Sequence, residues 1–254
     1  MLKNLLSRLP EAVKLPLREI RTTIMAMPNK GSRRFCPVCE RSSRRFISFG
    51  VIQRDDAKCV YCGSLERHRL VWLFLKGKTT LFDGNKKLLL HVAPEPCIES
   101  RLKKTLGTGY LSADLRHPGA MLKLDISKID LDDNSFDVII CNHVLEHVPN
   151  DKEAIKEIQR VLKPNGWAIL SVPITAEVTY EDDSVSSPSE RLKHFGQKDH
   201  VRRYGPDFID RLLDAGFGVT RITPRDVATP DECITLGLTA ATGEIYCCTK
   251  REGS

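Results

Sequence analysis

Four cysteines in the first quarter of the chain have the spacing of a metal site. Cys36 and Cys39 form CPVC, and after nineteen intervening residues Cys59 and Cys62 form CVYC. Thiolates separated by two residues can both face inward at a tight turn, and two such pairs complete a tetrahedral sulfur site for zinc. The alternatives are disulfides, which are rare in cytoplasmic proteins, or four unrelated buried thiols. Because four protein ligands leave no open position, we expect a structural zinc.

Three polar residues further along the chain each follow a short apolar run. Asp114 ends YLSAD, Asp125 follows LKL, and Asn142 ends FDVIICN. If these runs are neighbouring parallel strands, their carboxyl ends meet at one edge of a sheet, where ligands bind. Asp114 could there accept both ribose hydroxyls of a nucleoside, while Asp125 and Ile126 could receive a purine ring. A helix cap or a solvated turn would explain any one of these acids alone.

Strands alternating with helices are expected to position these residues. We predict strands in KKLLLHVA, YLSADL, AMLKLDI, FDVIICNHV, WAILSVPI, GVTRITPRD and GEIYCCTKR, and helices in PCIESRLKKTLG, DKEAIKEIQRVLKPNG and PDFIDRLLDAGF. Pro164 and Gly166 are expected to end the second of these helices. The alternation predicts an α/β fold with a doubly wound parallel sheet.

At this point the chain resembles class I S-adenosylmethionine-dependent methyltransferases of the type 11 kind, over roughly residues 86 to 250. The matching pieces are LLLHVAPEP, YLSADL, LKLDI, FDVIICNHVLEHVPN, RVLKPNGWAILSVP and LLDAGF. The resemblance implies a Rossmann-like sheet of seven strands with the last strand antiparallel. It also implies S-adenosylmethionine as cofactor, with Asp114 and Leu115 at the ribose, Asp125 and Ile126 at the adenine, and Asn142 at the edge of the same crevice.

The first strand-to-helix turn departs from the family pattern. His91, Ala93, Glu95 and Cys97 stand where the family usually has an acidic residue followed by glycines at alternate positions. S-adenosylmethionine has no phosphates, and its methionyl end carries an ammonium beside a carboxylate. Glu95 could pair with the ammonium while backbone N–H groups bind the carboxylate. We expect a working cofactor site that includes His91 and Ala93; the alternative is a non-catalytic binding module that has lost its cofactor.

Two histidines are candidates for the general base that methyl transfer to a hydroxyl or protonated amine requires. His143 follows the fourth strand, and His200 lies in the polar segment 175–204, which we expect to be a mobile lid. Beside it, Arg202, Arg203 and Tyr204 could bind an anionic or sugar-like acceptor. A structural role in capping a loop is the alternative for each histidine.

The segment from His143 to His147 also fits H-x-x-E-H, an inverted zinc-protease pattern. That chemistry needs both histidines and the glutamate on one stable helix. Here the segment follows directly on a predicted strand, and Pro149 comes two residues after it. We therefore expect it to line the substrate side of the cofactor crevice.

The composition is that of an ordinary globular protein, with 41% apolar and 28% charged residues and a formal net charge of +6. No apolar run approaches the roughly 20 residues that span a bilayer. The leucines of residues 1–32 suggest a short amphipathic helix interrupted by Pro10 and Pro16, without the features of a secretory signal. We therefore expect a cytoplasmic protein with an N-terminal arm (1–32), a zinc ribbon with a linking helix (33–80) and a methyltransferase domain (81–254).

The methyl acceptor is not specified by the sequence. A small molecule or saccharide under the segment 175–204 is the first expectation. RNA is the second, since some RNA methyltransferases carry an N-terminal four-cysteine module and this ribbon is rich in arginine, with Arg33, Arg34, Arg41, Arg44 and Arg45.

Overall fold

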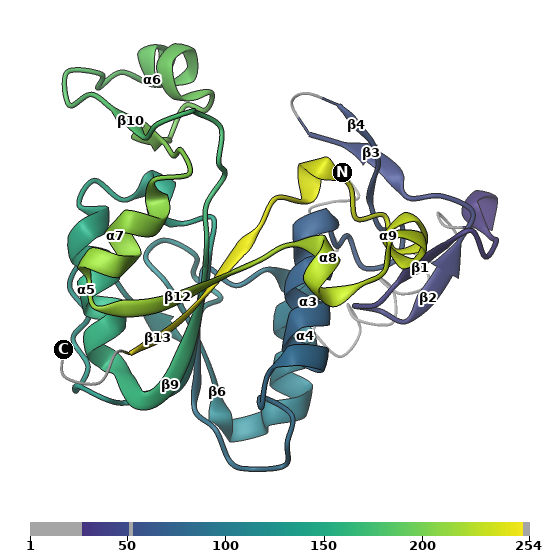
Figure 1. Cartoon of the computed structure of the whole chain (residues 1–254), viewed down its shortest axis with the longest axis horizontal. Coiled ribbons are helices and arrows are strands. Elements are labelled where there is room, and N and C mark those ends of the chain that lie inside the picture. Colours follow the sequence, from purple (N-terminus) through teal and green to yellow (C-terminus); the bar gives the residue numbers. More distant parts are fainter. Residues whose placement is uncertain (1–26, 51–52, 251–254) are drawn as a thin grey trace.

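A seven-stranded mixed sheet forms the centre of the protein (Figure 1). The computed structural model describes residues 27–50 and 53–250, so most of the predicted N-terminal arm lies outside the described residues. The strand order is β12-β13-β9-β8-β5-β6-β7, and β13 runs antiparallel to both of its neighbours. The strands are β5 (Leu89–Val92), β6 (Tyr110–Asp114), β7 (Leu122–Lys123), β8 (Phe136–Asn142), β9 (Leu162–Ser171), β12 (Phe217–Ile222) and β13 (Ile245–Lys250). The predicted fold class is confirmed.

Helices cover both faces of this sheet (Figure 1). One face packs against α5 (Asp151–Val161) and α7 (Phe208–Asp214), and the other against α3 (Glu66–Lys78) and α4 (Pro96–Leu106). Two short helices, α8 (Pro224–Val227) and α9 (Pro230–Leu236), connect β12 to β13 in the chain and pack on the second face. Short 3-10 turns complete the chain at η1 (Met27–Asn29), η2 (Gly107–Gly109), η3 (Leu145–His147) and η4 (Ala240–Thr242).

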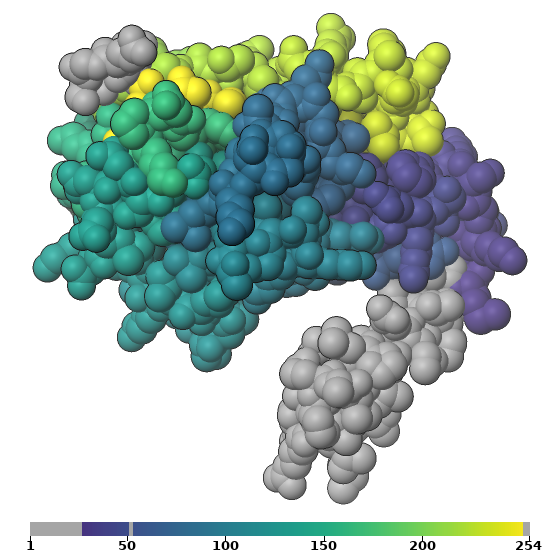
Figure 2. Space-filling model, turned by 90° about the horizontal axis from the view of Figure 1, so that it is seen from below, coloured from purple at the N-terminus to yellow at the C-terminus, as the bar shows by residue number. Residues whose placement is uncertain are grey.

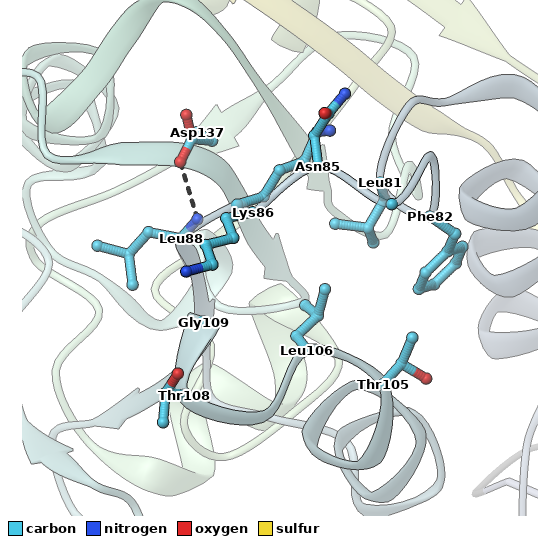
Figure 3. Close-up of a pocket in the computed structure, with 12 residues that line it drawn as sticks. Leu81, Phe82, Asn85, Lys86, Leu88, Thr105, Leu106, Thr108, Gly109 and Asp137 are labelled. Carbon is cyan, nitrogen blue, oxygen red and sulfur yellow. Dashed lines mark hydrogen bonds between the residues drawn. The ribbon is translucent and has the colours of Figure 1, made fainter.

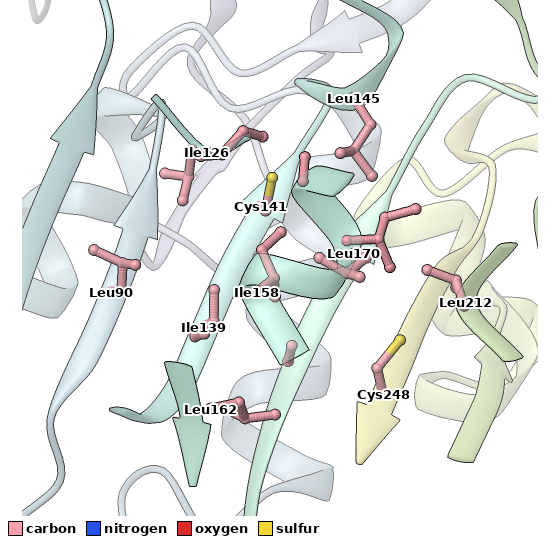
Figure 4. Close-up of a cluster of buried hydrophobic side chains, with 14 of the residues drawn as sticks. Leu90, Ile126, Ile139, Cys141, Leu145, Ile158, Leu162, Leu170, Leu212 and Cys248 are labelled. Atoms are coloured by element: carbon pink, nitrogen blue, oxygen red, sulfur yellow. The ribbon is translucent and has the colours of Figure 1, made fainter. Parts of the chain in front are cut away.

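The parallel strands are apolar in sequence because both of their faces are buried. Leu90 and Ile139 point into the cluster that contains Ile158 of α5 (Figure 4), whereas Leu89 and Ile140 point into the cluster that contains Ile98 of α4. Alternate residues of one strand therefore pack into the two hydrophobic clusters on opposite faces of the sheet, as expected for a sheet between two helical layers.

The boundary between α5 and β9 differs from the prediction. The helix ends at Val161, and Leu162 already has extended backbone angles (φ −76°, ψ 134°). Pro164 and Gly166 therefore lie within β9 instead of ending the helix. A residue that precedes proline avoids helical angles, so the helix stops before it reaches Lys163. Between the pairs Phe136–Leu162 and Val138–Trp167 the register shifts, and residues 163–166 bulge out of the ladder.

Two further elements differ from the sequence expectation. The third predicted strand is reduced to Leu122 and Lys123, because β7 is an edge strand that pairs with only two residues of β6. Asp125 therefore lies in the loop beyond this strand. The short helices α8 and α9 were not predicted.

The N-terminal module consists of two small hairpins and α3. Its strands are β1 (Arg34–Cys36), β2 (Arg41–Ser43), β3 (Ile47–Phe49) and β4 (Arg54–Lys58). Phe46 and Val38 belong to the same buried cluster as Ile98 and Leu89 of the sheet domain. Figure 2 shows the first part of the module, in purple, packed against the C-terminal part of the chain, in yellow-green. Arg69 joins the two, because its guanidinium is fully buried and donates to the carbonyls of Ser64 and Gly237.

The segment 175–204 contains three short elements, β10 (Tyr180–Glu181), α6 (Pro188–Phe195) and β11 (Arg202–Arg203). Figure 1 shows β10 and α6 standing out above α7. The hairpin of β10 and β11 attaches the segment to the sheet domain, because the Arg202 guanidinium donates to the carbonyls of Leu145 and Pro149.

Candidate active site

The four cysteines of the N-terminal module form one cluster. Cys36 Sγ lies 3.6 Å from Cys62 Sγ, Cys39 Sγ lies 3.8 Å from Cys59 Sγ, and all four sulfur atoms lie within 4.8 Å of one another. Zinc–sulfur bonds of about 2.3 Å in a tetrahedron place the sulfurs about 3.8 Å apart. The cluster therefore has the dimensions of a four-thiolate zinc site.

The glycine-free turn after β5 adopts the shape that glycines usually allow. Ala93 has a left-handed φ of +45°, and its N–H donates to the Ala113 carbonyl at 2.8 Å. Such a φ is uncommon for alanine, and residues held in it cluster at functional sites. The turn therefore curls toward β6 without a glycine.

Hydrogen bonds of Glu95 and His91 stabilise this turn. The fully buried His91 ring contacts Tyr110 Oη through Nδ1 (3.0 Å) and Glu95 Oε2 through Nε2 (2.8 Å), while Asn142 Nδ2 donates to Glu95 Oε1 at 3.3 Å. Burial opposes ionisation of Glu95, but the hydrogen bond and charge of His91 outweigh it and lower the pKa of this carboxyl to about 2. Glu95 is thus an anion whose two oxygens already have protein partners.

A cavity of about 500 Å³ opens at the carboxyl ends of β5 and β6. Of the predicted cofactor residues, Ala93, Asp114, Leu115, Asp125 and Ile126 line it, whereas His91, Glu95 and Asn142 are outside its lining.

Both acids in this cavity keep one carboxylate oxygen available. Asp114 Oδ1 accepts from the N–H groups of Arg116 and His117, both at 2.7 Å, and Asp125 Oδ1 accepts from Ser127. Neither Oδ2 has a partner among the described residues. The free oxygens suit hydroxyl or amine donors of a ligand.

A second cavity, of about 690 Å³, adjoins the first, and His143 and His147 line both. His143 has a left-handed φ of +54°, and its N–H donates to the Ser171 carbonyl at 2.8 Å. The other residues that line this second cavity include Glu146 and His200, the run from Val172 to Thr175, and the stretch Ala240–Glu244. The two cavities therefore meet at His143, the residue that follows β8, and at His147.

Sequence reasoning missed the contribution of the N-terminal module to this second cavity. Arg54 of β4 and Arg67 of α3 line it together with Arg221 of β12. Arg54 is paired with Glu66 at 3.0 Å, but Arg67 Nε has no hydrogen-bond partner. Only the packing of α3 on the sheet domain brings Arg67 to the carboxyl edge, and the stretch GSLERHRL gives no local signal of it.

The predicted acceptor residues of the segment 175–204 have different surroundings. His200 lines the second cavity and is 6% exposed, and burial lowers its pKa, so that the ring is neutral near pH 7. Arg202 and Tyr204 are buried, and both direct their polar atoms to protein groups: Arg202 to backbone carbonyls and Tyr204 to Asp151. Neither residue lines the first or the second cavity.

Arg203 is part-exposed, and its guanidinium donates to Thr175. The H-x-x-E-H stretch ends in the 3-10 turn η3 (Leu145–His147) and does not form a long helix.

A third cavity, of about 580 Å³, lies at the opposite edge of the sheet (Figure 3). Asp137 lines it and accepts a hydrogen bond from the Leu88 N–H at 2.8 Å. This is the amino end of β5, whereas ligands of doubly wound sheets bind beyond the carboxyl ends. We therefore assign no cofactor to it.

Part of the chain matches known proteins. Residues 107–170 match a family model described as a methyltransferase domain. A protein of Mycobacterium ulcerans described as an uncharacterized methyltransferase is 26% identical over 59% of this chain and 63% of its own length. An uncharacterized 37.1 kDa protein in transposon Tn4556 of Streptomyces fradiae is 29% identical over 44% of this chain and 34% of its own. The chain thus aligns with less than two thirds of either relative.

Solved structures that are similar to this chain include an S-adenosylmethionine-dependent methyltransferase from Mesorhizobium loti. It is 12% identical, with a TM-score of 0.47, over 70% of this chain and 97% of that one. Another is 1,6-didemethyltoxoflavin-N1-methyltransferase from Burkholderia thailandensis, whose structure holds 1,6-didemethyltoxoflavin and S-adenosylhomocysteine. It is 15% identical, with a TM-score of 0.43, over 72% of this chain and 76% of that one. In the described residues of this chain, no helix is long and apolar enough to cross a membrane.

Proposed function

We propose that the protein is an S-adenosylmethionine-dependent methyltransferase that acts on a hydroxyl or amine of a small-molecule or saccharide acceptor. The observation that carries this proposal is the pair of cavities that meet at His143, at the carboxyl edge of the sheet. The match of residues 107–170 to a methyltransferase domain supports it.

The first cavity is the proposed cofactor site. Asp114 would bind the ribose through its free Oδ2, and Asp125 with Ile126 would receive the adenine. The turn around Ala93 would hold the methionyl end. Since the oxygens of Glu95 are bonded to His91 and Asn142, we assign Glu95 to the support of this turn. Its predicted pairing with the ammonium would require one of these bonds to open.

The second cavity is the proposed acceptor site. Bound S-adenosylmethionine would supply a methyl group on a sulfonium, so the protein has mainly to align the acceptor and exclude water. Val172, Pro173 and Ile174 form an apolar wall, and His143 and His200 are within this site to take a proton from the acceptor. Arg67 would provide a positive charge for an anionic or polyhydroxylated acceptor.

We further propose that the segment 175–204 is a lid. Arg191, Lys198 and Asp199 line the cofactor cavity while Gln197 and His200 line the acceptor cavity, so the segment covers both. The hairpin of β10 and β11 would be its fixed base, because Arg202 is anchored there.

The N-terminal module is the proposed zinc ribbon, with zinc on Cys36, Cys39, Cys59 and Cys62. Its role would be structural, and it would hold Arg54 and Arg67 in place at the acceptor site.

Calorimetry with S-adenosylhomocysteine tests the proposed function. We expect one binding site per chain, and competition by S-adenosylmethionine. A protein that binds neither compound would be a non-catalytic relative of the fold. The RNA alternative is favoured by the exposed arginines of the ribbon (Arg33, Arg41, Arg44 and Arg45), and binding to RNA that weakens steeply with salt would support it.

A further inference from the structure

Three side chains at the acceptor cavity are arranged like the ligands of a metal ion, apart from the cysteine cluster. Glu146, His147 and His200 each offer a ligand atom, and these atoms lie within 4.8 Å of one another. Glu146 and His147 come from η3, and His200 comes from the end of the segment 175–204. The rings of His147 and His200 meet edge to face, with centroids 4.7 Å apart.

Glu146 is a buried carboxylate with an oxygen that has no partner. The residue is 1% exposed, and its Oε2 has no hydrogen bond. Its Oε1 lies 3.3 Å from His143 Nδ1. A buried carboxylate oxygen without a partner is costly, and such atoms are rare in folded proteins. A cation held between Glu146 and the two histidines would satisfy it.

His147 is oriented as a metal-binding histidine usually is. Its Nδ1 lies 3.2 Å from the Asp199 carbonyl oxygen and 3.3 Å from Asp199 Oδ2. Because both oxygens can only accept, Nδ1 carries the proton and the lone pair of the neutral ring is on Nε2. Metal-binding histidines commonly donate their second N–H to a carbonyl or carboxylate in this way.

We propose that Glu146, His147 and His200 bind one divalent transition-metal ion, whose open coordination positions face the acceptor cavity. Two histidines and one carboxylate form the donor set of many catalytic zinc and non-haem iron sites. Three protein ligands leave positions for a substrate oxygen, in contrast to the four thiolates of the ribbon. Within the H-x-x-E-H stretch, Glu146 and His147 would be the ligands. The first histidine, His143, contacts the Glu146 carboxylate.

The role of this ion rests on the proposed methyl transfer and narrows its acceptor to a hydroxyl. A hydroxyl bound to the ion would have a lowered pKa and would lose its proton to His143, which lines the same cavity, while His200 would serve as a ligand and not as a base. The acceptor oxygen then forms a bond to the methyl carbon. The carbon–sulfur bond of the sulfonium breaks, and its electron pair remains on sulfur as a neutral thioether. No oxidant or reductant takes part.

Zinc content tests the site directly. The full chain is dialysed against zinc-buffered solution, and bound zinc is counted by mass spectrometry. We expect about two zinc ions per chain in the wild type, one on the thiolates and one here, and about one in Glu146→Gln and His147→Gln. His194→Gln is the matched control, because this histidine lies in the same segment but stacks on Tyr180, and it should keep both ions.

Melting curves show whether each variant is folded. His147 is 35% exposed, so His147→Gln decides the question even if Glu146→Gln does not fold. A wild type with one zinc, or a folded His147→Gln with two, would overturn the proposal. Calorimetry with S-adenosylhomocysteine on the same samples tests the proposed methyltransferase function separately from the metal site. If the protein binds S-adenosylhomocysteine but no second metal ion, the metal site is refuted and the proposed function is not. If it binds a second metal ion but no S-adenosylhomocysteine, the proposed function is refuted and the metal site is not.

Discussion

Asp114→Asn probes the cofactor site with little disturbance of its surroundings. Asp114 Oδ1 accepts from the N–H groups of Arg116 and His117, both at 2.7 Å, and an amide oxygen can keep both bonds. The change therefore falls on Oδ2, which has no partner among the described residues. Asparagine replaces this charged acceptor by an uncharged NH₂ group. The turn after β6 should stay capped while the ribose loses its partner.

The expected loss follows from the strength of a charged hydrogen bond. A bond to a charged group contributes about 1.5–3 kcal/mol, which corresponds to a fall in affinity of about 10- to 150-fold. Asp114 is part-exposed, and water screens its charge, so we expect the lower half of this range. Asp114→Ala also removes the two backbone hydrogen bonds. It should lose more affinity and, unlike the asparagine variant, lower the melting temperature.

Calorimetry with S-adenosylhomocysteine measures both variants against the wild type. Asp130→Asn is the control, because Asp130 is an exposed acid outside the lining of the cofactor cavity. It should leave the affinity unchanged. Equal affinities of Asp114→Asn and the wild type would refute the assignment of the ribose to Asp114.

Three further predictions follow from the ribbon, the turn and the lid. Cys59→Ser should release the ribbon zinc and lower the melting temperature, since the metal holds the small hairpins together; metal analysis that finds zinc retained would contradict this. The pKa of Glu95 is lowered to about 2, so the ionised carboxylate stabilises the folded state by about 3 kcal/mol at pH values above about 4.5. This contribution to the free energy of unfolding is lost as the pH falls toward 2. Denaturant unfolding of Glu95→Gln should depend less on pH in this range than unfolding of the wild type, and parallel curves would refute the account. Hydrogen exchange of residues 182–198 should slow when S-adenosylhomocysteine binds, if this part is a closing lid; strong protection in the free protein would mark it as fixed structure.

Much of the fold could be predicted because each strand carries its own signal. The run Leu88 to Leu90 and the run Val138 to Cys141 are continuously apolar, since helices cover both sides of the sheet. The helices α8 and α9 also carry a local signal in the sequence. Thr223 and Thr229 each cap a helix with proline at its first position and an acid three residues later.

The candidate site was predictable only where it depends on strand ends. Asp114 lies at the carboxyl edge because its strand ends there. His200 and His147 are 53 positions apart in the chain, and only the return of the segment 175–204 to η3 brings their rings into contact. Arg67 reaches the acceptor cavity through the packing of α3 on the sheet domain. Neither contact is encoded in a local pattern, because both depend on long-range packing.

The most direct test of the central claim is a crystal structure of the protein soaked with S-adenosylhomocysteine. The account predicts density in the cavity at the carboxyl ends of β5 and β6, with the ribose hydroxyls in hydrogen-bond contact with Asp114 Oδ2. The adenine should lie against Ile126, and the sulfur should face His143 and the second cavity. An empty cavity at saturating ligand, or density in the cavity beside Asp137 at the other edge of the sheet, would contradict it.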